Sequence, residues 1–410
     1  MIYLKTTALS LTLALAASGA HAGCGISAGS VRILANDFEA LDAVIATAKE
    51  CAGDGVEVTS NATTEHAELQ VPALSGNPAE YTVKILANDS IVPLLNKGLL
   101  RQLDDLVTKF GQDLEASQLI KIDGKVMAVA FMANAQHLTY RADLLITAGI
   151  EPPKTYEDVL VAAQTLREKG ILETPVGLNL KPGWDLGEEF VNMYLGYGGD
   201  FFVPGSAELA LDPAQAVHAL DMLKALSAYM PADFNTFDTE ALSPLYEQGK
   251  VGLMNMWGSR ASSYLGADVL PEVSANTVFA AAPTVGGGTK PATTIWWDGF
   301  SIAQNISDAD AEASFRAMIH GASADMAKAN PDLAVWLIKG IEPGPAAVGV
   351  IASAQAGAAP YPMVPQMGVL HSALGTELAD FLAGKENAEQ ALSDVKAAYD
   401  AAAREQGFLN

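Results

Sequence analysis

Runs of buried-type residues alternate with segments of helical spacing along the first third of this 410-residue chain. The strand-like runs cover 31–35, 56–59, 81–87 and 125–131, and helical spacing covers 39–51 and 91–96. Strands that are separated by helices form parallel βαβ units, so this order predicts a doubly wound sheet and an α/β fold. The chain is long enough for two or three domains.

The same alternation continues to the C-terminus. Thr155 and Asp158 form a capping box that opens a helix ending at Lys169 and Gly170. Further helices are predicted over 213–229, 308–320 and 386–404, and further strands near 278–282 and 299–303. Trp336 is predicted to be a core residue of a helix over 333–338, and the Ala- and Gly-rich stretch 346–360 is predicted to lie on the surface.

The N-terminus has the organisation of a signal peptide. Lys5 precedes an apolar run over 8–17, and Ala20-His21-Ala22 follows as a small-x-small cleavage site. The run is too short to span a bilayer, so we expect cleavage after Ala22 and export to the periplasm. A buried first helix and lipid attachment at Cys24 are the alternatives. A lipoprotein site prefers a Leu-like residue where this chain has His21.

The chain has two cysteines, Cys24 and Cys51, which flank the first predicted strand and helix. Because an exported protein meets an oxidising compartment, we predict a disulfide between them, with two free buried thiols as the alternative. The six histidines are scattered without the spacing of metal ligands, so no metal or cofactor is expected.

Charge and motifs narrow the function classes. Asp and Glu number 48 against 24 Lys and Arg, which argues against a nucleic-acid partner and against an anionic membrane surface. The one G-x-S-x-G match, at 25–29, is followed by a strand rather than by the helix that a hydrolase nucleophile requires. We therefore expect a protein that is not an enzyme.

Several segments, in order along the chain, resemble the extracellular solute-binding proteins of sugar ABC importers. The most specific is Gly-Lys before the strand at 125–131, then Tyr-x-x-Asp-Leu at 140–144, then Pro-Lys-Thr-Tyr-Glu at 153–157. The other similar segments are 94–104, 248–254, Ala282-Pro283, Pro-Gln-Met at 365–367, and 382–392. The set is similar to the maltodextrin-binding-protein-like group, which has the type II periplasmic-binding-protein fold.

The resemblance implies two lobes, each a mainly parallel sheet flanked by helices, joined by crossing hinge segments. The crossings are expected near 132–135, 279–283 and 322–330. One lobe would then comprise 23–133 with about 281–325, and the other about 134–280 with 326–410. The ligand would lie in the cleft between the lobes, which close around it by hinge bending.

A sugar site requires carboxylates and amides for hydroxyl groups and aromatic faces for the rings. Parallel sheets place ligands at the carboxyl ends of their strands. That rule selects Asn36, Asp37, Asn88, Asp89 and Asn134. The resemblance places Asp89 at the family's sugar-binding carboxylate. For Asn36, Asp37 and Asp89, helix capping is the alternative role.

The resemblance also shows two departures from the family pattern. Asn134 falls where the family has a ligand-contacting Glu, and His371 falls near the family's stacking Trp. Both residues are retained as candidate ligand contacts.

Tryptophans provide the candidate stacking faces. Trp296, Trp297 and Asp298 are adjacent, and because side chains alternate along a strand, one of the two Trp residues must face the cleft or solvent. The remaining candidates are Trp257 with Arg260, and Trp184 with Asp185. Packing in the core is the alternative role for each Trp.

These observations predict a monomeric periplasmic binding protein that captures a sugar or sugar alcohol and delivers it to the permease subunits of an ABC importer. A binding protein for a polyamine or another cationic solute is an alternative, because acidic residues and Trp faces suit a cation. A secreted carbohydrate hydrolase with two carboxylates is the alternative from a different class.

Overall fold

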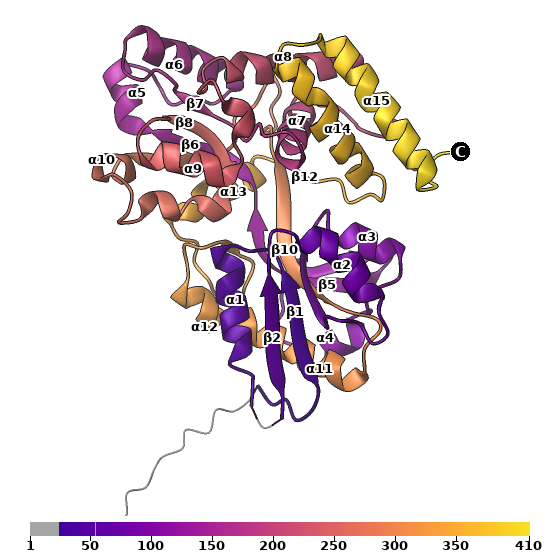
Figure 1. Cartoon of the computed structure of the whole chain (residues 1–410). Coiled ribbons are helices and arrows are strands. Elements are labelled where there is room, and N and C mark those ends of the chain that lie inside the picture. The colour runs from indigo at the N-terminus through magenta and orange to yellow at the C-terminus, as the bar shows by residue number, and fades with distance from the viewer. Residues whose placement is uncertain (1–23, 54) are drawn as a thin grey trace, which may run out of the picture.

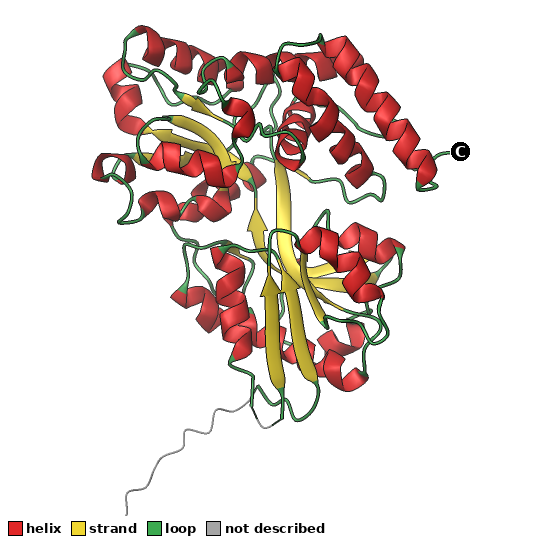
Figure 2. Ribbon diagram, viewed as in Figure 1, coloured by secondary structure: helices red, strands yellow, loops and turns green. Residues whose placement is uncertain are grey.

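The computed structural model describes residues 24–53 and 55–410. The chain forms two α/β lobes, each built on its own sheet (Figure 1). Helices cover both sheets (Figure 2), which agrees with the predicted two-lobed α/β fold.

The first sheet has the strand order β11-β5-β10-β3-β1-β2, with β4 paired to β5 and β12 paired to β10. The bounds are β1 Ser30–Ala35, β2 Glu57–Ala62, β3 Val83–Ala87, β4 Leu119–Ile122, β5 Lys125–Asn134, β10 Thr294–Ile302, β11 Val335–Trp336 and β12 Ala359–Pro360. The strands expected at 31–35, 56–59, 81–87 and 125–131 all belong to this sheet.

Helices lie on both faces of the first sheet, as the alternation of elements requires. They are α1 Glu39–Lys49, α2 His66–Ser75, α3 Ile91–Asn96, α4 Asp104–Phe110, α11 Asp308–Gly321 and α12 Ala324–Ala329. In α1 the residues Leu41, Val44 and Ala48 are buried at helical spacing, and they pack with β1 in one apolar cluster. A second cluster, around Leu74 and Ile91, fills the opposite face.

The second sheet has the order β7-β8-β6-β9. Its strands are β6 Gln136–Arg141, β7 Val176–Gly177, β8 Leu253–Trp257 and β9 Thr277–Ala280. The helices of this lobe are α5 Ala142–Ala148, α6 Tyr156–Glu168, α7 Trp184–Gly196, α8 Pro213–Ser227, α9 Thr239–Glu247, α10 Pro271–Ser274, α13 Val348–Gln355, α14 Met367–Leu382 and α15 Ala388–Glu405. The predicted capping box opens α6, where the Asp158 N–H donates to Thr155 Oγ1 at 3.0 Å.

Two strands carry the chain between the lobes, as Figure 1 shows for β10. β5 ends at Asn134, and β6 begins in the other sheet at Gln136. β10 returns to the first sheet, where it pairs antiparallel with both β3 and β5.

The sheets are mixed rather than mainly parallel. In the first sheet, β1, β2, β3 and β5 share one direction, whereas the central β10 and the short β4 and β11 run against it. In the second sheet, β6 runs against β7, β8 and β9. The physical reason is that the chain crosses between the lobes. β6 and β10 enter their sheets at the end that borders the cleft, whereas the strands antiparallel to β6, and β1, β2, β3 and β5 in the first sheet, run toward the cleft.

The third connection, expected near 322–330, stays a prediction. That stretch includes α12, which packs against α1 in the first lobe. Trp336 is buried, as expected, but it lies in the short strand β11, which pairs with β5 of the first sheet, rather than in a helix. The stretch 346–360 is not simply surface: α13 packs on β9 and β6, and Gly349 lies so close to the His137 ring that a Cβ would clash with it.

A disulfide joins Cys24 and Cys51, as predicted, and ties the start of the described chain to the end of α1. His320 lies near both sulfurs, but a cysteine in a disulfide has no thiolate to offer a metal ion. None of the helices in the described part of the chain has the length and apolarity needed to cross a membrane. The signal-peptide prediction falls outside the described residues.

Candidate functional site

A cavity of about 480 Å³ lies between the two sheets, where strands of both lobes end. Asn36 and Asp37 follow β1, Asp89 follows β3 and Asn134 ends β5. From the second lobe, Trp257 ends β8. The carboxyl ends of strands thus supply both walls, as the rule for open α/β sheets predicts.

Ten of the thirteen candidate ligand contacts line this cavity. They are Asn36, Asp37, Asp89, Asn134, Trp184, Asp185, Trp257, Arg260, Trp296 and Asp298. The structure therefore brings residues that are up to 262 positions apart in the numbering, from Asn36 to Asp298, into one site (298 − 36 = 262).

Asn88, Trp297 and His371 do not line the cavity. The Asn88 side chain is buried against β10, where its Oδ1 accepts from the Trp297 N–H at 2.9 Å. Trp297 packs with the apolar cluster of the first lobe, because side chains alternate and its neighbour Trp296 takes the cavity side. His371 is buried on α14, behind Trp184.

One wall of the cavity is aromatic. The rings of Trp184, Trp257 and Trp296 contact one another, with centroids 5.6 to 6.0 Å apart. Trp184 is 42% exposed, whereas Trp296 is only 5% exposed. Trp184 therefore has a free face that can stack on a ligand, and Trp296 serves mainly as its support.

The Trp wall is held from behind by α14. The His371 ring stacks on Trp184 at 5.1 Å, its Nε2–H donates to the Trp184 carbonyl, and its Nδ1 accepts from the Tyr361 hydroxyl at 2.9 Å. Gly187 permits this approach, because a Cβ there would lie 2.6 Å from the His371 ring. Burial lowers the pKa of His371, so its ring is neutral at neutral pH.

Carboxylates from the first lobe also line the cavity. Burial raises the pKa of Asp298 to about 7; the Asp89 carboxylate adds to this rise, and Lys84 opposes it. Lys84 is fully buried on β3, and burial lowers its pKa to about 7 although Asp89 and Asp298 act in the opposite direction. The three groups form one charge cluster, in which Asp89 and Asp298 line the cavity and Lys84 lies behind them.

Lys84 also orients His66, which lines the cavity. Lys84 Nζ lies 2.6 Å from His66 Nδ1. Burial and then the Lys84 charge lower the pKa of His66 to about 3, so its ring is neutral. When Lys84 is protonated, its ammonium group has only donors, so Nδ1 accepts and the proton of the neutral His66 ring is on Nε2.

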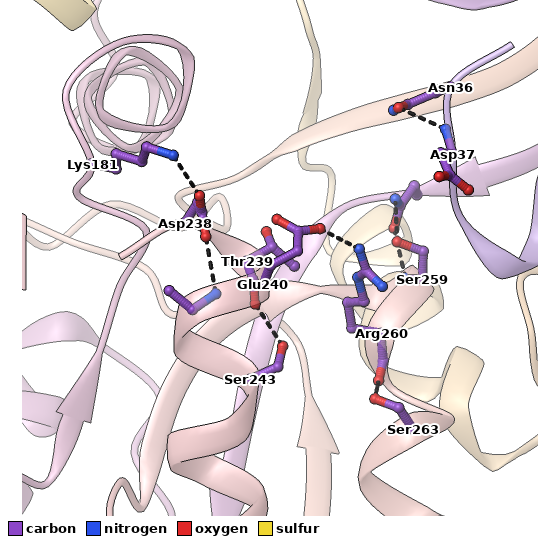
Figure 3. Close-up of polar contacts among 12 residues, drawn as sticks. Asn36, Asp37, Lys181, Asp238, Thr239, Glu240, Ser243, Ser259, Arg260 and Ser263 are labelled. Carbon is purple, nitrogen blue, oxygen red and sulfur yellow. Dashed lines mark hydrogen bonds and ion pairs between the residues drawn. The ribbon is translucent and has the colours of Figure 1, made fainter. Parts of the chain in front are cut away.

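The polar groups of the second lobe are shown in Figure 3. Arg260 forms an ion pair with Glu240 at 2.5 Å, and Lys181 forms one with Asp238 at 2.7 Å. Burial and then the Asp238 charge raise the pKa of Asp185 to about 7. The cation of Arg260 is thus already neutralised within the wall.

Asn134 and Ser259 join the two lobes beside the cavity. The Asn134 side-chain amide donates to Ser259 Oγ, and the Ser259 N–H donates to Asn134 Oδ1, both at 3.2 Å. The resemblance implies a ligand-contacting Glu at position 134. In this chain the Asn134 amide stands there, and it is already hydrogen-bonded to Ser259 of the second lobe.

Asp37 and Asp89 do not cap the helices that follow them, which was the alternative role. The N-cap residue of α1 is Phe38 and that of α3 is Ser90, and neither helix has a side-chain cap. Asp89 Oδ1 accepts only from the N–H of the adjacent Ser90. Both carboxylates border the cavity instead.

The sequence reasoning missed several polar lining residues: Thr64, His66, Glu68, Ser90, Thr239, Glu240 and Ser259. The first three follow β2 or begin α2, so the rule of strand ends, applied to the second strand, would have found them. Thr239 and Glu240 carry no such signal, because they begin a helix after a long loop.

The matching family model decides the classification. It describes the bacterial extracellular solute-binding proteins and matches residues 34–319. The chain belongs to this family.

Solved structures show the same fold as this solute-binding protein. Maltose-bound MalE3 of T. maritima has a TM-score of 0.79 at 19% identity, covering 91% of this chain and 99% of that one. An ABC transporter solute-binding protein of Agrobacterium radiobacter in complex with ribitol has a TM-score of 0.78 at 19% identity, covering 91% and 98%. One of Agrobacterium vitis with bound D-mannitol has a TM-score of 0.72 at 19% identity, covering 93% and 99%. No curated protein sequence matches significantly.

For a solute-binding protein, a site between two lobes has a direct physical advantage. A ligand that contacts both walls favours the arrangement in which the walls are close, because it gains contacts only there. In this protein a ligand in the cavity would contact both the aromatic wall of the second lobe and the carboxylate wall of the first.

Proposed function

We propose that this protein binds a sugar or sugar alcohol in the cavity between its lobes and delivers it to the permease of an ABC importer. One observation carries the proposal: the partly exposed Trp184 of the second lobe and the carboxylates Asp89 and Asp298 of the first lobe line a single cavity. The ligands of the structural neighbours, maltose, ribitol and D-mannitol, are consistent with it.

The two walls match the two kinds of surface on a carbohydrate. The C–H face of a sugar is apolar and packs on an indole ring. Its hydroxyls donate to carboxylates, and such charge-assisted hydrogen bonds are the stronger kind. A cavity of about 480 Å³ falls within the usual range for small-molecule sites.

The proposal includes export and simple binding. The chain would be cleaved after Ala22 and act as a monomer in the periplasm. It would return its ligand unchanged, because binding by hinge closure requires no nucleophile.

A thermal-shift screen with maltose, ribitol, D-mannitol and tagatose tests the function, followed by calorimetry on each compound that raises the melting temperature. Asp89→Ala should weaken binding about ten- to hundredfold, the range expected for about 1.5–3 kcal/mol from a hydrogen bond to a charged group. Asp113→Ala is the matched control, because Asp113 is exposed and lies outside the cavity.

Two results would contradict the proposal. One is that no sugar or sugar alcohol raises the melting temperature. The other is that chromatography of the incubated ligand shows cleavage products, which would indicate a hydrolase.

A further inference from the structure

The cavity has a surplus of carboxyl groups over cations. Six carboxylates line it: Asp37, Glu68, Asp89, Asp185, Glu240 and Asp298. Arg260 is the one Lys or Arg side chain among the lining residues of the described structure. Neutral hydroxyl groups require acceptors, but they do not require six carboxyl groups.

The nearby cations do not balance this charge. Arg260 is paired with Glu240, which removes one carboxylate and the single lining cation together. Lys181 interacts with Asp185 over a longer range but is paired with Asp238. Lys84 is bonded to His66 beneath the cavity, and its one charge acts on both Asp89 and Asp298. At most one cation is therefore left for five carboxylates.

Asp298 shows the imbalance most directly. It borders the cavity, and no described residue donates a hydrogen bond to its carboxylate. Burial raises its pKa to about 7, as does burial for Asp185. A cation in the cavity would lower both values and so bind with a favourable free energy.

The aromatic wall suits the same charge. Trp184 and Trp257 present indole rings to the cavity, and the face of an indole ring attracts an ammonium group. The wall that stacks on a sugar ring therefore also accepts a cationic substituent on that ring.

We propose that the preferred solute is a polyhydroxylated compound that bears a protonated amine, such as an amino sugar or an amino polyol. This inference rests on the proposed function and narrows its ligand class. The amine would lie beside Asp298 and Asp89, whose charges act on each other, and the hydroxyls and the C–H face would use the remaining walls.

Pairs of ligands that differ in one amino group test the effect of the ligand's positive charge. Calorimetry at about pH 6.5 compares D-glucosamine with D-glucose, and 1-amino-1-deoxy-D-glucitol with D-glucitol. In at least one pair the amine should bind about tenfold tighter or more than the neutral ligand. One charge-assisted hydrogen bond changes the affinity by about this factor. That preference should shrink as salt is added, because salt screens the attraction.

A substitution at Asp298 tests where in the cavity the amine binds. Asp298→Asn keeps the size of the side chain and removes its charge, so the affinity ratio between amine and neutral ligand should fall severalfold. Asp113→Asn, far from the cavity, should leave the ratio unchanged. An unaltered ratio in Asp298→Asn would contradict the proposed place of the amine.

The remaining outcomes separate the two proposals. Equal or tighter binding of the neutral member in every pair overturns the amine and leaves the sugar function intact. Tighter binding of putrescine than of every amino sugar overturns the sugar class, because putrescine has no hydroxyls. Binding of no compound in either set overturns both.

Discussion

His66 shows how a buried neighbour sets the chemistry of a single residue. Its Nδ1 is occupied by Lys84, so the ring has one free hydrogen-bonding atom, Nε2. In a cavity lined by carboxylates, an N–H donor is scarce. A ligand oxygen that accepts a hydrogen bond is therefore expected beside His66, away from the carboxylates.

Replacing Lys84 with Met should release His66 from its fixed tautomer. At about pH 6 the wild-type Lys84 is mainly charged, because its pKa is about 7, and the His66 ring is neutral, because its pKa is about 3. Nitrogen-15 NMR of the wild-type ring should show the proton on Nε2 alone, and in Lys84→Met both tautomers should appear. Lys97→Met, on an exposed side chain, is the control. A single unchanged tautomer in Lys84→Met would refute the assignment.

The helix α7 connects the cavity to both crossings. It begins with the lining residues Trp184 and Asp185 and buries Glu188 and Glu189 one turn later. Glu188 accepts from Trp296 Nε1 at 3.1 Å and from Thr294 Oγ1 at 2.6 Å, so it holds β10. Glu189 accepts from Gln136 Nε2 at 3.2 Å, so it holds β6.

These buried carboxyls should make stability depend on pH. Burial raises the pKa of Glu188 from 4.5 to about 8. Between these values the folded chain keeps a proton that the unfolded chain has released, so its contribution to the free energy of unfolding falls as pH rises from 4.5 to about 8. The side chain of Glu188→Gln has no proton to lose. The free energy of unfolding of this variant should therefore fall less steeply with rising pH than that of the wild type, and the two slopes should differ by up to about 1.4 kcal/mol per pH unit.

Urea denaturation at several pH values between 5 and 8 measures the two slopes. Glu189 stays in the variant and keeps part of the dependence, because burial raises its pKa to about 8 as well. The exposed Glu389→Gln should behave as the wild type. Parallel curves for wild type and Glu188→Gln would show that Glu188 is ionised in the folded protein.

At the scale of the molecule, the cavity is a product of the two lobes together. The lobes have separate apolar cores; β5 runs from the first sheet toward the second, and β10 runs back into the first. Trp257 and Trp296 pack with the core of the second lobe, whereas Asp37, Glu68, Asp89 and Asp298 lie on or next to elements of the first lobe. The lobe boundaries expected at about 281, 325 and 326 stay predictions; α12, which spans the last of them, contacts α1 of the first lobe.

Ligand should therefore compact the molecule. Small-angle scattering with a saturating amount of the compound that binds best should give a smaller radius of gyration than the free protein, because closure brings the walls together. Asp89→Ala should need about ten- to hundredfold more ligand for the same change. An identical radius with and without ligand, at proven saturation, would contradict hinge closure.

Much of the local structure was determined by the sequence. Burial periodicity predicted β1, α1 and β3, the Thr155 capping box predicted the start of α6, and export predicted the Cys24–Cys51 pair. The strand-end rule found Asp37 and Asp89 because it depends only on chain direction within a parallel unit. These signals are local, and a short stretch of sequence contains them completely.

Only the tertiary structure decided what each buried residue faces. Periodicity predicts that Trp336 is buried, but pairing with β5 makes it a strand rather than a helix. Alternation requires one of Trp296 and Trp297 to face outward, but the packing of the second lobe selects Trp296 for the cavity. His66 depends on Lys84 and His371 on Trp184, contacts between segments that the sequence does not pair. The physical reason is that hydrophobic burial has no direction, so a sequence pattern specifies that a side chain leaves water but not which partner it meets.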